Sequence, residues 1–234
     1  MSFSNGPKGI VTDGLIFSAD AGNDQCYTSG SATAINLIGG QTLTLENGSA
    51  PNIIPYDNSW EFDGSDDYID CGASSVYGIP GSANLTLEMF MRKDASDKQV
   101  LIAAYNNTPK VGIYLQWATD GEIYFGFTQT VYNKYSLSFT DANTWIHCVG
   151  VYDGTQVSNA DEAKIYVNGV NQTVTAGSIP DTISATDVDV QIGSAQNFPG
   201  YTDGGIGNIR IYNRSLTASE VLQNYNSQKS RFGL

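Results

Sequence analysis

The stretch that decides the fold is WIHCVGVYDG at residues 145–154, which continues after a polar insertion as IYVNG at residues 165–169. Asp-Gly and Asn-Gly pairs end the two segments, and such pairs tolerate the positive φ that tight hairpin turns require. Successive side chains of a strand point to opposite faces, which places Trp145, His147 and Val149 together on one face. The stretch therefore predicts consecutive antiparallel strands joined by turns.

Similar strand-like runs recur from end to end of the chain. They cover residues 15–18, 42–46, 60–63, 68–71, 85–92, 100–104, 111–117, 123–128, 135–139, 145–152, 164–167, 172–175, 188–192 and 208–212. About fourteen short strands separated by turn residues predict an all-β fold of two stacked antiparallel sheets. We expect the core to contain Leu87, Met89, Ile113, Leu115, Phe125, Val149, Ile165 and Ile211.

One short C-terminal helix is expected, at residues 217–228. Thr217 can cap its first turn and Glu220 can bond back as a capping box, while Leu216 and Val221 supply a hydrophobic staple. We expect this helix to close one edge of the sandwich. A chain of 234 residues suits one such domain, which we place at residues 10–227, between an N-terminal arm at 1–9 and a C-terminal arm at 228–234.

The composition limits the partners that the chain can have. Lys and Arg total 11 against 24 Asp and Glu, and the net charge of −13 repels both nucleic-acid phosphates and anionic membranes. The first residues, MSFSNGPKGIVTDG, hold no apolar stretch that could act as a signal sequence, so we expect synthesis in the cytoplasm without one. The unrelated spacings of Cys26, Cys71 and Cys148 predict buried free thiols.

Five motifs, taken together and in order, carry a family resemblance. They are FDGSDDYIDC at 62–71, LTLEMFMR at 85–92, WIHCVGVYDG at 145–154, IYVNG at 165–169 and GNIRIYNRSLTASEVLQNY at 207–225. This series resembles the concanavalin A-like, laminin-G-like jelly-roll domains, which implies a two-sheet sandwich of a kind that often binds carbohydrate or protein. Residues 6–23 and the Arg231-Phe232 ending are also similar to copies of this domain in virion proteins of tailed bacteriophages.

The resemblance points to calcium as the metal to consider. Relatives carry an acidic pair before the final strand, where an Asp helps to hold a structural calcium, whereas this chain has Gly207 and Asn208 there. Independently of the resemblance, four carboxylates cluster within nine residues and could supply oxygen ligands, although their spacing is not that of an EF-hand loop. The alternative is a solvated turn. The candidates are Asp63, Asp66, Asp67 and Asp70, with Asp20 and Asp203 as weaker ones.

The sequence does not favour catalysis. Enzymes that resemble this chain hydrolyse glucans with an E-x-D-x-x-E strand, which places three carboxylates on one face, and that spacing is absent here. Glu88 stands alone on its strand and is expected to face solvent. His147 is expected to be a core histidine, because no Ser or Cys motif offers it a nucleophile. We therefore expect no enzymatic activity and no catalytic residues.

A glycan-binding face is the more plausible site. Tyrosines alternate with core isoleucines on several strands, and amide or guanidinium side chains continue the same alternation. Aromatic rings stack on sugars while such polar groups bond hydroxyls. The alternative is that tyrosine simply suits a half-exposed sheet surface. The candidate residues are Tyr114, Gln116, Tyr124, Tyr166, Asn168, Arg210 and Tyr212.

Three functions compete at this point. The leading one is a non-enzymatic virion protein of a tailed phage, located on the capsid as a decoration or on the tail or fibre. Its partners would be other virion proteins, a second copy of the chain and host surface glycan, with Phe3, Arg231 and Phe232 as docking residues. The second is a carbohydrate-binding adhesion module. The third, a glycoside hydrolase or polysaccharide lyase, lacks its expected residue pattern.

Overall fold

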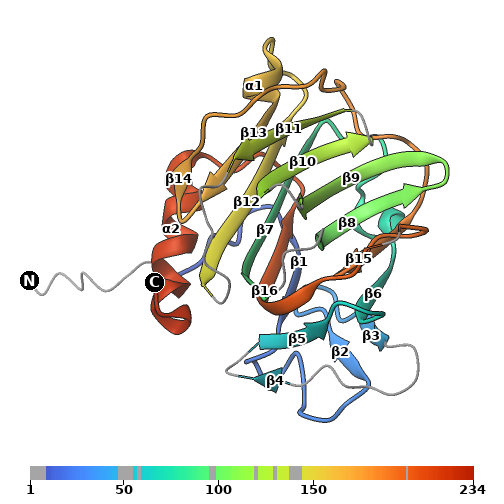
Figure 1. Cartoon of the computed structure of the whole chain (residues 1–234), viewed down its shortest axis with the longest axis vertical. Helices are drawn as coiled ribbons and strands as arrows, with labels where there is room; N and C mark the ends of the chain where they lie inside the picture. The colour runs from blue at the N-terminus through green and yellow to red at the C-terminus, as the bar shows by residue number, and fades with distance from the viewer. Residues whose placement is uncertain are drawn as a thin grey trace, which may run out of the picture.

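The computed structural model describes residues 9–46, 55–56, 59–94, 99–118, 121–128, 131–136, 144–198 and 200–234. Within them, two antiparallel sheets of eight strands each pack face to face (Figure 1). We call them sheet A and sheet B. The all-β, two-sheet jelly-roll sandwich that the sequence predicts is confirmed.

Sheet A has the strand order β14-β13-β12-β7-β16-β5-β4, and β1 pairs with β16 off this path. Its strands are β1 (Leu15–Asp20), β4 (Pro55–Tyr56), β5 (Ser59–Asp63), β7 (Asn84–Lys93), β12 (Trp145–Asp153), β13 (Ala163–Val167), β14 (Val170–Asn171) and β16 (Asp203–Tyr212). The deciding stretch lies here, with β12 between β7 and β13. Asn168 and Gly169 adopt φ of 50° and 79° in the turn after β13, as the Asn-Gly pair predicts.

Sheet B has the order β11-β10-β9-β8-β15-β6-β3-β2. Its strands are β2 (Thr33–Ile35), β3 (Thr42–Glu46), β6 (Tyr68–Ala73), β8 (Gln99–Asn107), β9 (Lys110–Trp117), β10 (Glu122–Thr128), β11 (Val131–Ser136) and β15 (Asp189–Ile192). The strand expected at residues 172–175 is not formed: β14 ends at Asn171, and the four residues hold only an isolated bridge position. Part of the expected strand 135–139 lies outside the described residues.

The main core fills the space between the sheets. Leu87 and Met89 of β7 point into it as their alternation predicts, and Ile146 and Cys148 of β12 join them. Gly150 of β12 leaves room for the ring of Phe125 from sheet B, since a Cβ there would lie 2.6 Å from that ring. All three cysteines are buried and free, as expected.

Val149 is buried but belongs to a second core, which corrects one of our predictions. This second core lies on the outer face of sheet A and contains Val11, Val149, Val151, Tyr166, Tyr212, Leu216 and Val221. It forms because α2 (Ala218–Gln228) packs on that face, beside β14 and β12 in Figure 1. The helix therefore covers a face of the sandwich rather than closing an edge. Its start is as predicted, with Thr217 and Glu220 forming a capping box.

The C-terminal residues continue this cover, whereas the sequence suggested an arm at 228–234. After α2 comes the 3-10 helix η2 (Lys229–Phe232). The ring of Phe232 stacks on Phe90, with centroids 4.5 Å apart, and lies 4.8 Å from the ring of Trp145. Arg231 forms a bidentate ion pair with Asp20. Both side chains expected to dock on partners are thus engaged within the chain, and Phe3 lies outside the described residues.

Two further short helices are described, the 3-10 helix η1 (Ser74–Tyr77) after β6 and α1 (Asn159–Glu162) between β12 and β13. In the described part of the chain, no helix combines the length and the apolar character needed to cross a membrane.

Candidate functional site

The candidate site lies on the outer face of sheet B, where β3, β6 and β15 run side by side. In β6, Ile69 and Cys71 point into the core, so Tyr68 and Asp70 must point outward. Register places Glu46 of β3 opposite Tyr68 and Gln191 of β15 opposite Asp70. Period-two alternation therefore brings side chains from three strands to one surface.

A second tyrosine reaches this surface from the segment between β15 and β16. Tyr201 precedes Thr202, whose backbone N–H donates to the carbonyl of Gly193 at 2.8 Å and whose hydroxyl donates to the carbonyl of Val100 at 2.7 Å. These two bonds hold the residue after Tyr201 against Gly193 and against Val100 of β8. The rings of Tyr68 and Tyr201 lie with centroids 6.5 Å apart and planes inclined by 40°.

The same segment crosses the surface at Gln196, whose Nε2 donates to Oδ2 of Asp189 at 3.1 Å. We call the six half-buried residues of this surface the tyrosine face. They are Glu46, Tyr68, Asp70, Asp189, Gln191 and Tyr201.

The tyrosine face has a strongly negative environment. Burial is the first cause that raises the pKa of Tyr68, and the nearby carboxylates of Glu46, Asp70 and Asp189 raise it further. Burial also raises the pKa of Asp189, with added repulsion from Asp70. The face therefore combines aromatic rings with groups that accept hydrogen bonds, a combination suited to stacking on a sugar and bonding its hydroxyls.

The seven residues expected to form a glycan face do not form one surface. Tyr114, Gln116 and Tyr124 lie on the outer face of sheet B, in β9 and β10, and are separated from β6 by at least β8 and β15. Tyr114 is 6% exposed and Gln116 is 2% exposed. Tyr124 is half-buried, and its hydroxyl bonds Glu122 at 3.2 Å.

The other four lie on sheet A. Tyr166, Arg210 and Tyr212 point to its outer face and are 4%, 3% and 0% exposed, because α2 covers them. Asn168 sits in the turn between β13 and β14, where its Oδ1 accepts a bond from the N–H of His147 at 2.9 Å. The three covered side chains are not available for stacking on a glycan, whereas Asn168 is half-buried.

A buried polar cluster lies beneath α2. Oε1 of Glu88 is 2.9 Å from Nε2 of His147 and 3.3 Å from Nη1 of Arg210, and Oε2 accepts from Asn224 at 2.7 Å. Burial raises the pKa of Glu88, but the bond with His147 and the charge of Arg210 bring it below its ordinary value. Glu88 was expected to face solvent, and that prediction is wrong because Asn224 of α2 lies over it. His147 is a core histidine, as predicted.

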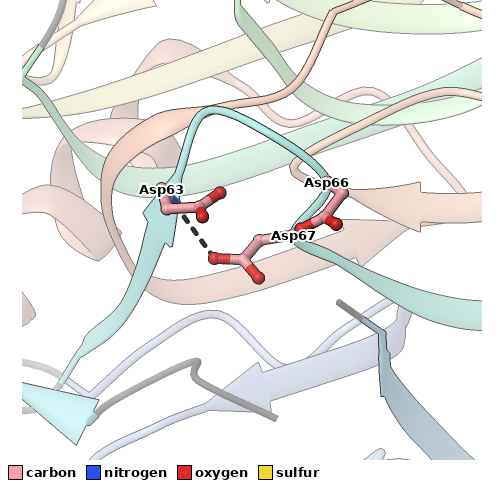
Figure 2. Close-up of side chains that lie close together, drawn as sticks. All are labelled: Asp63, Asp66 and Asp67. Atoms are coloured by element: carbon pink, nitrogen blue, oxygen red, sulfur yellow. Dashed lines mark hydrogen bonds between the residues drawn. The ribbon is translucent and has the colours of Figure 1, made fainter. Parts of the chain in front are cut away.

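The acidic loop between β5 and β6 gathers three of the four predicted carboxylates, as Figure 2 shows. Ligand oxygens of Asp63, Asp66 and Asp67 all lie within 4.8 Å of one another, and Oδ2 of Asp67 accepts from the N–H of Asp63 at 3.0 Å. Burial raises the pKa of Asp67, and the charges of Asp63 and Asp66 add to this rise. These three residues could hold a cation.

The remaining calcium candidates lie elsewhere. Asp70 belongs to the tyrosine face, and Asp20 is paired with Arg231. The side chain of Asp203 lies beside Gly64, next to the acidic loop.

Gly207 and Asn208, where relatives carry an acidic pair, lie within β16 under the C-terminal segment. A Cβ at Gly207 would lie 2.4 Å from the ring of Phe232, and Nδ2 of Asn208 donates to Gln228 at 3.1 Å. These contacts with the C-terminal segment explain why Gly and Asn fit at these two positions.

Sequence reasoning did not identify the tyrosine face. The alternation of Tyr68 and Asp70 with Ile69 and Cys71 was a usable signal for β6. No comparable signal marks Tyr201, because it lies outside a strand and reaches the face through the course of the segment between β15 and β16.

Comparison with known proteins agrees with the fold. The family model described as the concanavalin A-like lectin/glucanases superfamily matches residues 63–222. No curated protein sequence matches the chain significantly.

Two solved structures illustrate the likeness. Trypanosoma rangeli sialidase in complex with sialic acid is 15% identical with a TM-score of 0.66, and the match covers 95% of this chain and 34% of the sialidase. The receptor binding domain of botulinum neurotoxin C/D mosaic serotype is 15% identical with a TM-score of 0.66, over 92% of this chain and 51% of that one. This chain thus spans about a third and about half of their lengths. At such identities the likeness shows the fold alone.

Proposed function

Since the chain belongs to the concanavalin A-like lectin/glucanases superfamily, we propose that it is a non-enzymatic binding domain that recognises glycans through the tyrosine face. The observation that carries this proposal is the half-exposed pair of Tyr68 and Tyr201, flanked by the side chains of Asp70, Asp189 and Gln191. Aromatic rings bind the apolar faces of sugars, and carboxylate and amide groups fix the hydroxyls around them.

Two similar structures are consistent with a surface that contacts a ligand. The sialidase was solved with sialic acid, and the neurotoxin domain is a receptor-binding domain. Because this chain covers a third to a half of those proteins, its own ligand has to be argued from its own residues.

The lack of catalysis is part of the proposal. Glu88 and His147 are close enough to act as an acid and base pair, but both are 0% exposed beneath α2 and no substrate can reach them. A hydrolase or lyase would need such groups at the surface. Release of reducing ends from laminarin, agar or alginate above a boiled control would contradict this part of the proposal.

A virion role remains a prediction from the sequence resemblance. On this proposal the domain would display its tyrosine face on a phage particle and bind neighbouring virion proteins or a second copy of itself. Arg231 and Phe232 do not support docking, since both are engaged within the chain. Labelled antibody against the chain, imaged on particles from its source, would test the location on capsid or tail.

The glycan proposal is tested by binding measurements on the intact chain. Tyr68→Ala and Tyr201→Ala should each weaken binding to any glycan that the chain selects from an array by about tenfold or more, as expected for loss of a stacking residue. Tyr124→Ala, on the same sheet face but in β10, is the matched control and should retain binding. Equal losses in all three variants, or no glycan bound at all, would contradict the proposal.

A further inference from the structure

Resting on this proposed function, we infer that the tyrosine face selects glycans that carry no acidic groups and discriminates against sialylated, uronic and sulfated ones.

Three carboxylates act on the phenol of Tyr68. Its phenol feels Glu46, Asp70 and Asp189 together, so carboxylates from three neighbouring strands surround the ring. Each is half-buried. Screening by water is therefore weaker than at a fully exposed surface.

The described strands of sheet B supply little positive charge to offset these carboxylates. Among the described side chains in the strands of sheet B, the basic one is Lys110, which lies at the start of β9 in the β8–β9 hairpin. The described ion pairs of Arg92, Arg210, Arg214 and Arg231 all join residues outside the strands of sheet B. An acidic sugar placed on Tyr68 would meet the like charges of Glu46, Asp70 and Asp189, which act on its phenol.

The carboxylates also influence which hydrogen bonds the face can form. An ionised carboxylate is an acceptor with two oxygens, so Asp70 and Asp189 suit sugar hydroxyls, which can donate. A sialic or uronic carboxylate and a sulfate ester are acceptors as well, and Asp70 and Asp189 offer them no donor. The donors of the face, the amide of Gln191 and the phenols of Tyr68 and Tyr201, are uncharged and serve neutral hydroxyls equally well. Charge and hydrogen bonding therefore favour the same class of ligand.

The test uses the intact chain and matched pairs of glycans. The probes are lactose and N-acetyllactosamine, their sialylated and sulfated derivatives, and oligomers of glucose, mannose and N-acetylglucosamine. We expect binding among the neutral members and affinity about tenfold lower or more for the acidic partner of each pair, equivalent to about 1.4 kcal/mol. The ratio should shrink as salt rises from about 0.05 to 0.5 M, because the repulsion is screened.

Charge variants make the test specific. Asp70→Asn with Asp189→Asn keeps the size of the side chains and should reduce the discrimination ratio severalfold, whereas Asp161→Asn, on the exposed helix α1, should leave it unchanged. Acidic glycans that bind as well as or better than their neutral partners would overturn the inference while leaving the proposed function standing. Absence of binding to every probe would instead overturn the proposed function, and the inference with it.

Discussion

The carboxylate of Glu88 and the imidazole of His147 lie 2.9 Å apart, and both side chains are fully buried between sheet A and α2. Arg210 approaches the same carboxylate oxygen at 3.3 Å, and Asn224 of α2 bonds the other. A Glu–His pair with the composition of a catalytic acid and base thus lies buried between sheet A and α2. We expect this pair to stabilise the contact between the helix and the sheet.

Glu88→Gln tests the cluster directly. The substitution keeps the shape of the side chain but leaves the guanidinium of Arg210 without its buried counter-charge. Breaking a buried ion pair in this way costs about 3–5 kcal/mol, so we expect a loss of that order in the free energy of unfolding measured with urea. Asp161→Asn, which removes an exposed pair with Lys164, should leave it almost unchanged. A loss below about 1 kcal/mol for Glu88→Gln would contradict the structural role.

Glu220 should make stability fall in acid. Its hydrogen bonds from Arg214 lower its pKa from 4.5 to about 2. Because the folded pKa lies below the unfolded one, the contribution is complete above pH 4.5 and is lost as pH falls through about 2. Glu220→Gln should therefore be less stable than the natural chain near neutral pH, by about 1–2 kcal/mol, and the difference should narrow in acid. A constant difference at every pH would indicate loss of the helix cap alone.

The contribution of Asp67 to stability should depend on pH in the opposite direction. Burial and the charges of Asp63 and Asp66 raise the pKa of its carboxyl in the folded state. The folded state therefore loses stability as pH rises and this carboxyl ionises. In metal-free buffer at neutral pH, Asp67→Asn should raise the free energy of unfolding by about 0.5–1 kcal/mol, since the amide oxygen can still accept from Asp63. Urea unfolding in EDTA measures this.

Calcium provides the control for the acidic loop. Thermal unfolding of the natural chain and of Asp67→Asn should show the same small response to added calcium if the loop is a solvated turn. A rise in melting temperature that the variant lacks would show that Asp67 takes part in binding the cation.

Local patterns predicted much of the fold, and long-range contacts decided the rest. The alternation in β7 correctly placed Leu87 and Met89 in the main core, and the Asn-Gly pair correctly ended β13. The same alternation led to the wrong expectation that Glu88 faces solvent. A period of two assigns side chains to the two faces of a sheet, but it does not say what covers the outer face. The cover comes from α2, more than a hundred positions later in the chain, through Asn224.

The candidate site was harder to predict for a related reason. Tyr166 and Tyr212 have the alternation of surface tyrosines, yet α2 buries them, while Tyr68 stays accessible on the other sheet. Which outer face receives a helix is set by chain topology and not by the residues of the strands themselves. Tyr201 depends in turn on the bonds of Thr202 to Gly193 and Val100, which no local pattern encodes.

The C-terminal segment yields the sharpest prediction, a double-mutant cycle between Gly207 and Phe232. A Cβ on Gly207 would lie 2.4 Å from the ring of Phe232, while its other close neighbour, Phe90, stays at an ordinary 3.6 Å. Gly207→Ala should therefore force Phe232 off β16, at about 1–3 kcal/mol, and Phe232→Ala should lose about 3 kcal/mol through its contacts with Phe90 and Trp145.

In the double variant the ring that the new methyl group would strike is gone. Its loss should therefore match that of Phe232→Ala alone within about 0.5 kcal/mol, a non-additivity that urea unfolding of the four proteins would measure. Gly9→Ala, where no atom lies within 4 Å of the added Cβ, is the matched control and should be neutral in both backgrounds. If Gly207→Ala costs as much without the ring as with it, Phe232 does not pack on β16, and the segment after α2 would again be free to act as the arm that the sequence suggested.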